Sequence, residues 1–188
     1  MKRIVESIIE VGKALYGEGL VDSHSGNISV IFKEHIFITR KGARLGFLSR
    51  EDIIKLNKNK PGILKERASS EVDVHISILK STKKRCLVHA HPPYTILCSL
   101  KMDIFKPRDW EGKEILQDVN IVDTKKPSAS EELIRTLTEE FKNRSIVIVK
   151  GHGVFSVHEN LYEAYKLISV LEHSCKINFL EACYGKDS

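Results

Sequence analysis

Two histidines separated by one residue, His89 and His91, lie in the apolar segment RCLVHAH. Side chains two apart on a strand project from the same face, with α-carbons about 7 Å apart, so both imidazoles can reach one metal ion. His152 is a plausible third ligand, because it follows the apolar run SIVIVK and lies between Gly151 and Gly153, which let the backbone turn tightly. Three neutral imidazoles leave one position of a tetrahedral zinc ion open, as in catalytic zinc sites.

Packing also places many histidine pairs on strands, so an HxH pattern alone is a weak indication of metal. The Gly-His-Gly sequence at the end of a second apolar run strengthens it. We interpret the other five histidines as structural or solvated: His24, His35, His75, His158 and His173.

Glu71 is expected in the first turn of a helix, just after Ser69 and Ser70. A carboxylate there usually serves only as a favourable partner of the helix dipole. If it faces the metal, it can instead be the acid/base that moves protons to and from the substrate. Helical periodicity does not choose between these two interpretations.

Three polar segments could bind an anion. The loop Asp22–Asn27 exposes backbone N–H groups and short hydroxyls, and Thr39–Gly42 adds two cations beside a glycine after a strand. Ser69-Ser70 opens a helix, where unpaired N–H groups and the dipole attract negative charge. Each segment can equally be an ordinary turn or cap, and spacing alone does not show that they meet.

The elements that must position these residues follow from patterning. We expect one domain over residues 1–188, an α/β sandwich with a mixed sheet, because strands alternate with helices and hairpins. Predicted helices cover residues 3–16, 70–80, 94–100, 130–143 and 160–182. Residues 49–52 have capping chemistry for a short helix, although Ile53, Ile54 and Leu56 could also lead into a strand. Predicted strands cover 27–32 and 36–40 as a hairpin, 85–91, 145–150 and 154–157, and 101–127 is irregular with short strands.

Composition favours a cytoplasmic protein with a small anionic ligand. Hydrophobic residues are 41% and charged residues 29%, and no apolar run reaches the roughly 18 residues of a membrane span. The net charge of +5 comes from dispersed Lys and Arg without a nucleic-acid motif, so neither nucleic acid nor membrane is an expected partner. The cysteines form no CxxC pair and are interpreted as buried reduced thiols: Cys86, Cys98, Cys175 and Cys183.

Five ordered motifs resemble the class II aldolase and adducin family: SGNIS at 25–29, ITRKG at 38–42, SSE at 69–71, VHAH at 88–91 and GHGV at 151–154. The resemblance spans about residues 3–182. It implies a three-layer α/β/α sandwich with a central mixed, largely antiparallel sheet. It also implies a homotetramer with C4 symmetry and active sites at subunit interfaces.

By matched position, the resemblance implies one Zn²⁺ or another divalent cation per subunit, held by His89, His91 and His152. It implies that Glu71 is the general acid/base and also coordinates the metal when no substrate is present. The substrate phosphate would be held by the matched residues of three motifs: Gly26, Asn27, Lys41, Gly42, Ser69 and Ser70.

The expected reaction is reversible cleavage of a ketose 1-phosphate, such as L-fuculose 1-phosphate, to dihydroxyacetone phosphate and an aldehyde. Glu71 favours the aldolases over the 4-epimerases, which resemble them but carry aspartate at this position. Dehydration of methylthioribulose 1-phosphate and decarboxylation of a sugar-acid phosphate stay open. Intact histidines argue against a non-catalytic, adducin-like module.

The chain also departs from the fuculose enzymes of this family. Lys41 stands where they have threonine, and Ser23 and His24 replace a glycine and a threonine. The tyrosine that a neighbouring subunit supplies in those enzymes has no clear match in the segment 107–113. The substrate therefore does not follow from the motifs.

Overall fold

The computed structural model describes residues 2–184 and contains an eight-stranded sheet with the strand order β3-β2-β1-β4-β8-β7-β6-β5. All neighbouring strands are antiparallel except β6 and β7, which are parallel. The predicted mixed, largely antiparallel sheet is confirmed. The strands are β1 Asn27–Phe32, β2 His35–Thr39, β3 Ile53–Asn57, β4 Cys86–Ala90, β5 Ile104–Phe105, β6 Val119–Val122, β7 Ile146–Val149 and β8 Gly153–His158.

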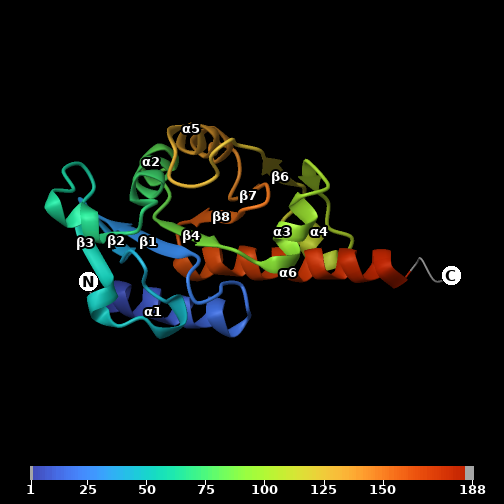
Figure 1. Ribbon diagram of the computed structural model, residues 1–188, viewed down its shortest axis with the longest axis horizontal. Helices are drawn as coiled ribbons and strands as arrows, with labels where there is room; N and C mark the ends of the chain where they lie inside the picture. The colour runs from blue at the N-terminus through green and yellow to red at the C-terminus, as the bar shows by residue number, and fades with distance from the viewer. Residues whose placement is uncertain (1, 185–188) are drawn as a thin grey trace.

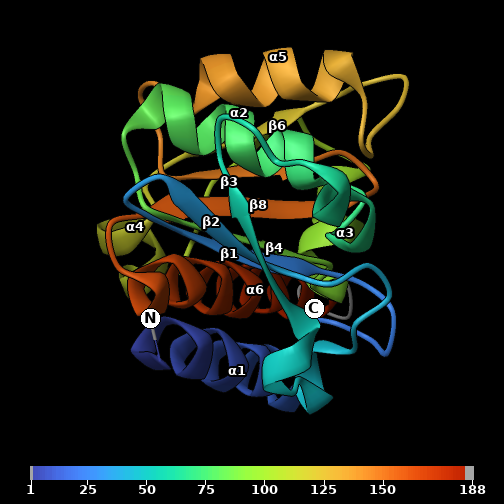
Figure 2. The ribbon, with the colours of Figure 1, turned by 90° about the vertical axis from the view of Figure 1, so that its left-hand side faces the viewer.

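Helices cover both faces of this sheet, which makes the predicted three layers (Figures 1 and 2). Helices α2 (Val72–Thr82) and α5 (Glu131–Glu140) lie on one face. Helices α1 (Lys2–Gly17) and α6 (Leu161–Tyr184) lie on the other, and α3 (Pro93–Ser99) packs beside α6. Short 3₁₀ turns occur at Leu45–Phe47, Arg50–Asp52 and Ile63–Arg67.

Alternation along β4 assigns its side chains to two separate apolar layers. Val88 and Ala90 belong to the core beneath α1 and α6, whereas Leu87 belongs to the core beneath α2 and α5. Because residues two apart share a face, His89 projects toward the α2 side. The sheet thus directs this histidine toward the helix that Glu71 precedes.

Local sequence signals account for most element boundaries. Ser130 accepts a hydrogen bond from the Leu133 N–H at 3.1 Å at the start of α5, and Asn160 accepts one from Tyr162 at 2.8 Å at the start of α6. Such side-chain caps satisfy N–H groups that a helix terminus leaves unpaired. The capping chemistry predicted at residues 49–52 is also confirmed: Ser49 and Asp52 form a capping box on a short 3₁₀ helix, which leads directly into strand β3.

Several sequence predictions need correction. Helix α2 begins at Val72, so Glu71 is the residue before the helix rather than part of its first turn. Strand β4 ends at Ala90, which leaves His91 just outside it. Segment 101–127 contains an unpredicted helix, α4 (Trp110–Ile115), capped by the Asp109 side chain.

The cysteines were predicted to be buried, and three of the four are. Cys183 is exposed near the end of α6, and all four are free thiols within residues 2–184. Over the same residues, no helix combines the length and apolarity needed to cross a membrane.

Candidate active site

The ring of His89 is held in one orientation at the centre of the sheet. It is 1% exposed and stacks on Phe155 of the neighbouring strand β8, with ring centroids 3.9 Å apart. Its Nδ1 lies 3.0 Å from the carbonyl oxygen of Val154. Since a carbonyl only accepts, Nδ1 of the neutral ring must carry the proton, which leaves Nε2 as a bare lone pair. This is the tautomer that a metal ligand requires.

His91 and His152 present the same ring atom to the same point. Their Nε2 atoms lie 2.9 and 3.1 Å from that of His89. His152 reaches this position from the tight turn between β7 and β8, where Gly151 has a φ of +67°. A Cβ at Gly153 would lie 2.4 Å from the Ala90 carbonyl oxygen, so glycine permits the turn to approach β4. We call His89, His91 and His152 the histidine cluster.

The geometry of the histidine cluster fits a metal ion. All three ligand atoms lie within 4.8 Å of one another. Nitrogens bound tetrahedrally to zinc at 2.0–2.1 Å would be about 3.3 Å apart, close to the two distances in this structure. Sequence reasoning predicted this meeting correctly, although His91 lies beyond the strand itself.

Burial keeps these rings neutral. It lowers the pKa of His89 well below its usual value, with further lowering from His91 and His152. Burial lowers the pKa of His91 to about 4, although Glu71 acts in the opposite direction. The pKa of His152 is also lowered, mainly by burial. Because only a neutral imidazole has a free lone pair, the protein environment favours metal binding over protonation.

The Glu71 carboxylate borders the histidine cluster and is 3% exposed. Its Oε2 lies 3.5 Å from Nε2 of His89, and its Oε1 lies 3.9 Å from Nε2 of His152. The Asn27 side-chain amide donates to Oε2 at 2.9 Å, and the Ser128 hydroxyl donates to Oε1 at 3.3 Å. Glu71 therefore faces the metal ligands, which periodicity alone could not establish.

The other predicted residues line the same cleft of about 170 Å³, which also contains the histidine cluster: Gly26, Asn27, Lys41, Gly42, Ser69 and Ser70. Two backbone hydrogen bonds join the end of strand β2 to the segment before helix α2. The Ser69 N–H donates to the Thr39 carbonyl oxygen, and the Lys41 N–H donates to the Arg67 carbonyl oxygen. We call residues 40–42 and 69–70 the phosphate loops, after the role that the family motifs predict for them.

The phosphate loops offer both charge and hydrogen-bond donors. The Arg40 guanidinium is engaged by Asp52 at 2.7 Å, whereas the exposed Lys41 ammonium makes no ion pair within residues 2–184. Over those residues the backbone N–H groups of Gly42 and Ser70 also make no hydrogen bond. A free ammonium beside free N–H groups is suited to an anion such as phosphate.

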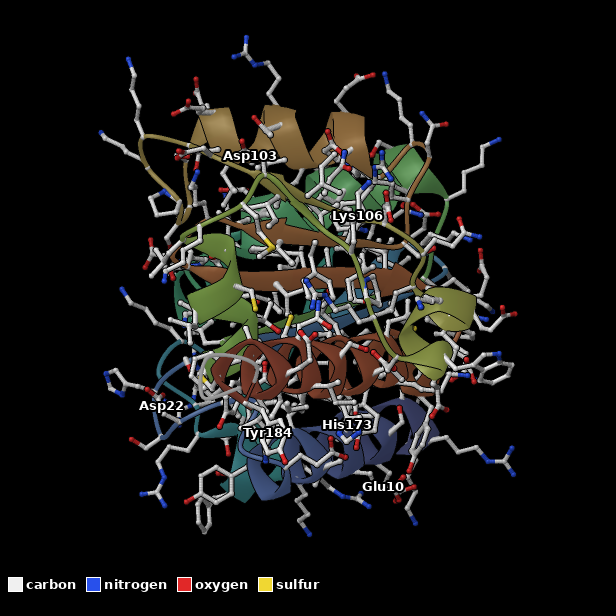
Figure 3. The ribbon with its side chains drawn as sticks, turned by 90° about the vertical axis from the view of Figure 1, so that its right-hand side faces the viewer. Glu10, Asp22, Asp103, Lys106, His173 and Tyr184 are labelled. Atoms are coloured by element: carbon white, nitrogen blue, oxygen red, sulfur yellow. The ribbon has the colours of Figure 1, made fainter. Side chains whose placement is uncertain are left out.

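Gly26 and Asn27 occupy the floor of the cleft. Gly26 has a φ of +84°, and a Cβ there would lie 2.9 Å from the His89 carbonyl oxygen, so only glycine fits without displacement. The preceding loop is organised by Asp22, which is labelled in Figure 3. Its carboxylate accepts from the N–H groups of His24 and Ser25. These bonds lower the pKa of Asp22.

The carboxylate of Glu172 on α6 fixes the segment that follows His91. It accepts from the N–H groups of Tyr94 and Thr95 at 2.9 and 2.8 Å, at the start of α3. This buried carboxylate thus anchors the chain three residues beyond a metal-ligand candidate. Nothing in the sequence singled it out.

Sequence reasoning also missed Ser128, which enters the cleft from the loop between β6 and α5. Its contact with Glu71 joins residues 57 apart in the chain, so no local pattern could reveal it. His24 and Arg40 line the cleft as well. The default interpretation of His24 as structural or solvated did not anticipate this position.

Comparison with known proteins agrees with this geometry. Residues 6–179 match the family described as Class II Aldolase and Adducin N-terminal domain. The chain belongs to this family. An L-fuculose phosphate aldolase from Methanococcus maripaludis is 31% identical, over 93% of this chain and 95% of that protein. The methylthioribulose-1-phosphate dehydratase of Pseudoalteromonas translucida is 23% identical, over 94% of this chain and 92% of that protein.

A crystal structure of L-fuculose-1-phosphate aldolase from Thermus thermophilus superimposes with a TM-score of 0.94. It is 31% identical, and the match covers 100% of this chain and 98% of that one. The family and fold that the five motifs implied are confirmed.

Proposed function

We propose that this chain is a metal-dependent class II aldolase that reversibly cleaves a ketose 1-phosphate, of the L-fuculose 1-phosphate kind, to dihydroxyacetone phosphate and an aldehyde. The observation that carries the proposal is the position of Glu71. Its carboxylate lies within 3.5 Å of the histidine cluster and in the same cleft as the free ammonium of Lys41. The similarity to L-fuculose phosphate aldolases supports the same substrate class.

His89, His91 and His152 would hold the metal ion, for which we propose Zn²⁺, one per subunit. When bound, the ion would polarise the substrate's carbonyl and hydroxyl oxygens and stabilise negative charge that develops as the carbon–carbon bond breaks. The neutral, buried rings keep their lone pairs available for it.

The protein's own groups would bind the phosphate and move the proton. Lys41, Gly42 and Ser70 would donate to the phosphate, with Ser69, Gly26 and Asn27 completing the loops around it. Cleavage turns the hydroxyl-bearing carbon into the aldehyde, with loss of that hydroxyl's proton, and leaves the electron pair of the broken carbon–carbon bond on the ketone fragment. That fragment takes up one proton to give dihydroxyacetone phosphate, so the reaction neither gains nor loses a proton overall. Glu71 is the one carboxylate among the described residues that line the cleft, so we assign this proton transfer to it.

The test is an assay of zinc-loaded protein with a panel of ketose 1-phosphates, in which dihydroxyacetone phosphate is detected with a coupled reductase. We expect release from at least one member of the panel. Absence of product across the panel, with zinc still bound by elemental analysis, would contradict the aldolase proposal.

Dehydration is the second candidate, because a dehydratase of methylthioribulose 1-phosphate is also a relative. It would use the same ligands and carboxylate without breaking a carbon–carbon bond. Mass spectrometry of the product separates the two, since dehydration removes only water and cleavage yields two fragments. A sugar-acid phosphate decarboxylase, an open alternative, would instead release carbon dioxide, and a 4-epimerase would leave the mass unchanged.

The expected C4 tetramer with active sites between subunits, and the cytoplasmic location, stay predictions. Light scattering coupled to size-exclusion chromatography measures the former directly. A tetramer would bring residues of a second subunit to the open side of the cleft, where a counterpart of the missing tyrosine would be sought.

A further inference from the structure

Behind Glu71 runs a chain of buried polar side chains, of which the proposed reaction uses only the first, Asn27. The Glu71 carboxylate accepts from the Asn27 amide at 2.9 Å, and the Asn27 side-chain oxygen lies 2.5 Å from Nε2 of His75. Nδ1 of His75 lies 2.7 Å from the Ser29 hydroxyl. Ser29 and His75 are both 0% exposed. The chain thus runs from the cleft into the interior between β1 and α2.

The direction of every hydrogen bond in this chain follows from its first member. An ionised carboxylate only accepts, so Asn27 must turn its NH₂ group toward Glu71 and its oxygen toward His75. That oxygen only accepts, so Nε2 of His75 must carry the ring proton. Nδ1 is then a bare acceptor, and the Ser29 hydroxyl donates to it.

The arrangement matters because an asparagine amide has two nearly isosteric orientations. Rotated by half a turn, Asn27 would place its oxygen against the Glu71 carboxylate, and two acceptors would repel one another. Glu71 precedes helix α2 and has non-helical dihedral angles, φ −92° and ψ 13°, so the helix does not fix its side chain. Its orientation depends on the groups that bind its oxygens.

We propose that His75 is a positioning residue for Glu71: its Nε2–H holds the Asn27 amide in the one orientation that donates to the carboxylate. The proposal rests on the proposed role of Glu71 as the acid/base. Two further facts agree with it. Burial lowers the pKa of His75 to about 3, so the ring stays neutral with a single N–H. The alternative tautomer would also set a bare Nε2 against the Asn27 oxygen, two acceptors 2.5 Å apart, whereas the Ser29 hydroxyl can donate or accept and is satisfied by either tautomer.

Two substitutions of the same chemical class separate positioning from packing. In His75→Gln, the side-chain amide nitrogen can reach the place of Nε2 and still donate to Asn27. In His75→Asn, the shorter amide reaches only the place of Nδ1, so it keeps Ser29 and loses Asn27. Both variants bury one neutral amide at the same site.

We expect His75→Asn to lower kcat by about 10- to 100-fold, the scale of a misplaced catalytic group, with KM and zinc content unchanged. His75→Gln should retain most of the parent kcat. Equal kcat values for the two variants, at equal thermal stability and zinc content, would overturn the proposal. So would a loss of zinc from His75→Asn alone, because the residue would then support the ligands rather than Glu71.

A spectroscopic measurement tests the hydrogen-bond direction without any substrate. In ¹⁵N-histidine-labelled, zinc-loaded protein, the two ring nitrogens of His75 should give one protonated and one bare signal, with the proton on Nε2. A proton on Nδ1 would overturn the proposal, even if the substituted proteins failed to fold. Because this result does not depend on turnover, a failure of the aldolase proposal is distinguishable from a failure of this one.

Discussion

The histidine cluster and the phosphate loops border one cleft but are built in opposite ways. His89 is 1% exposed, stacked on Phe155 and held at Nδ1 by the Val154 carbonyl oxygen. Lys41 and Ser70 are exposed, on turns, with donors that remain free over residues 2–184. A metal ion needs bare lone pairs, which a buried, neutral ring supplies. A phosphate keeps much of its charge and hydration, and an exposed cation meets it at little desolvation cost.

The histidine cluster, with Glu71 and the buried side chains behind it, is called the buried half of the site. It should fail differently from the phosphate loops, the exposed half, when residues are substituted. Substitutions in the histidine cluster should remove the metal and therefore also the turnover that depends on it. Substitutions in the phosphate loops should weaken substrate binding and leave the chemistry intact. Zinc content, kcat and KM, measured side by side, distinguish these two kinds of failure.

The largest effect is expected from His89→Ala or His152→Ala. Each removes one of three ligands, so zinc content should fall close to zero and turnover should fall on the order of 10³-fold or more. Elemental analysis and the aldolase assay measure both. His173→Ala, at an exposed position on α6, is the matched control (Figure 3). Full zinc content in His89→Ala would mean that the cluster is not the metal site.

Glu71→Gln should separate chemistry from metal binding within the buried half. The amide is isosteric but cannot accept or deliver the proton, so kcat should fall by roughly 10²–10⁴-fold. Zinc content should stay at the parent value, because the three histidines remain. An unchanged kcat would remove Glu71 from the acid/base role.

The buried half should also make the metal-free protein sensitive to acid. Burial lowers the pKa of His75 from 6.5 to about 3, so below pH 6.5 the unfolded chain binds a proton that the folded chain does not. Stability from this residue is therefore full above pH 6.5 and lost as pH falls toward 3. Between pH 7 and pH 5 the loss is about 2 kcal/mol.

Urea unfolding of the metal-free protein at these two pH values measures the change. His75→Gln, which has no titrating group at position 75, should lose less stability over the same interval. The same pH dependence in both proteins would place the acid sensitivity elsewhere, with His91 the next residue to test because its pKa is lowered to about 4.

Lys41→Met keeps the aliphatic stem and removes the charge from the phosphate loops. Because a charge-assisted hydrogen bond contributes about 1.5–3 kcal/mol, and this one is exposed, KM for the phosphorylated substrate should rise about tenfold. Turnover and zinc content should change little, as for a contact made equally in ground and transition states. Lys80→Met, at an exposed position on α2, is the control. If KM stays constant, the phosphate lies elsewhere.

The two halves also differ in how far the sequence could predict them. Strand periodicity predicted that His89 and His91 could share one ion, and the Gly-His-Gly turn made His152 a plausible third ligand. The family motifs then matched all three residues to metal ligands. The family motifs assigned Asn27 to the phosphate, a role that stays a prediction. Its side chain, however, is bound to Glu71 and His75, and those contacts join residues 44 and 48 apart.

Long-range contacts of this kind have no local signature. His75 is an example, because the sequence pattern of a histidine on the buried face of a helix does not reveal whether it also binds another side chain. Its contact with Asn27 was therefore not predictable from the sequence. The fold was more predictable than the site, because its hairpins, caps and buried strands each depend on neighbours in sequence. Helix α4 was not predicted, because its six residues contain too few apolar positions to show a helical periodicity.

The smallest effect is expected from Ser128→Ala, where a loop residue meets the buried half. Its exposed hydroxyl donates to Oε1 of Glu71 at 3.3 Å, and one such bond contributes about 0.5–1.5 kcal/mol, so kcat should fall about threefold. Ser128→Thr keeps the hydroxyl and should retain the parent rate. If the contact acts through Glu71, adding Ser128→Ala to Glu71→Gln should lower kcat no further than Glu71→Gln does alone. An additive loss in the double variant would show that Ser128 acts on the substrate directly, which would place it with the phosphate loops rather than with the acid/base.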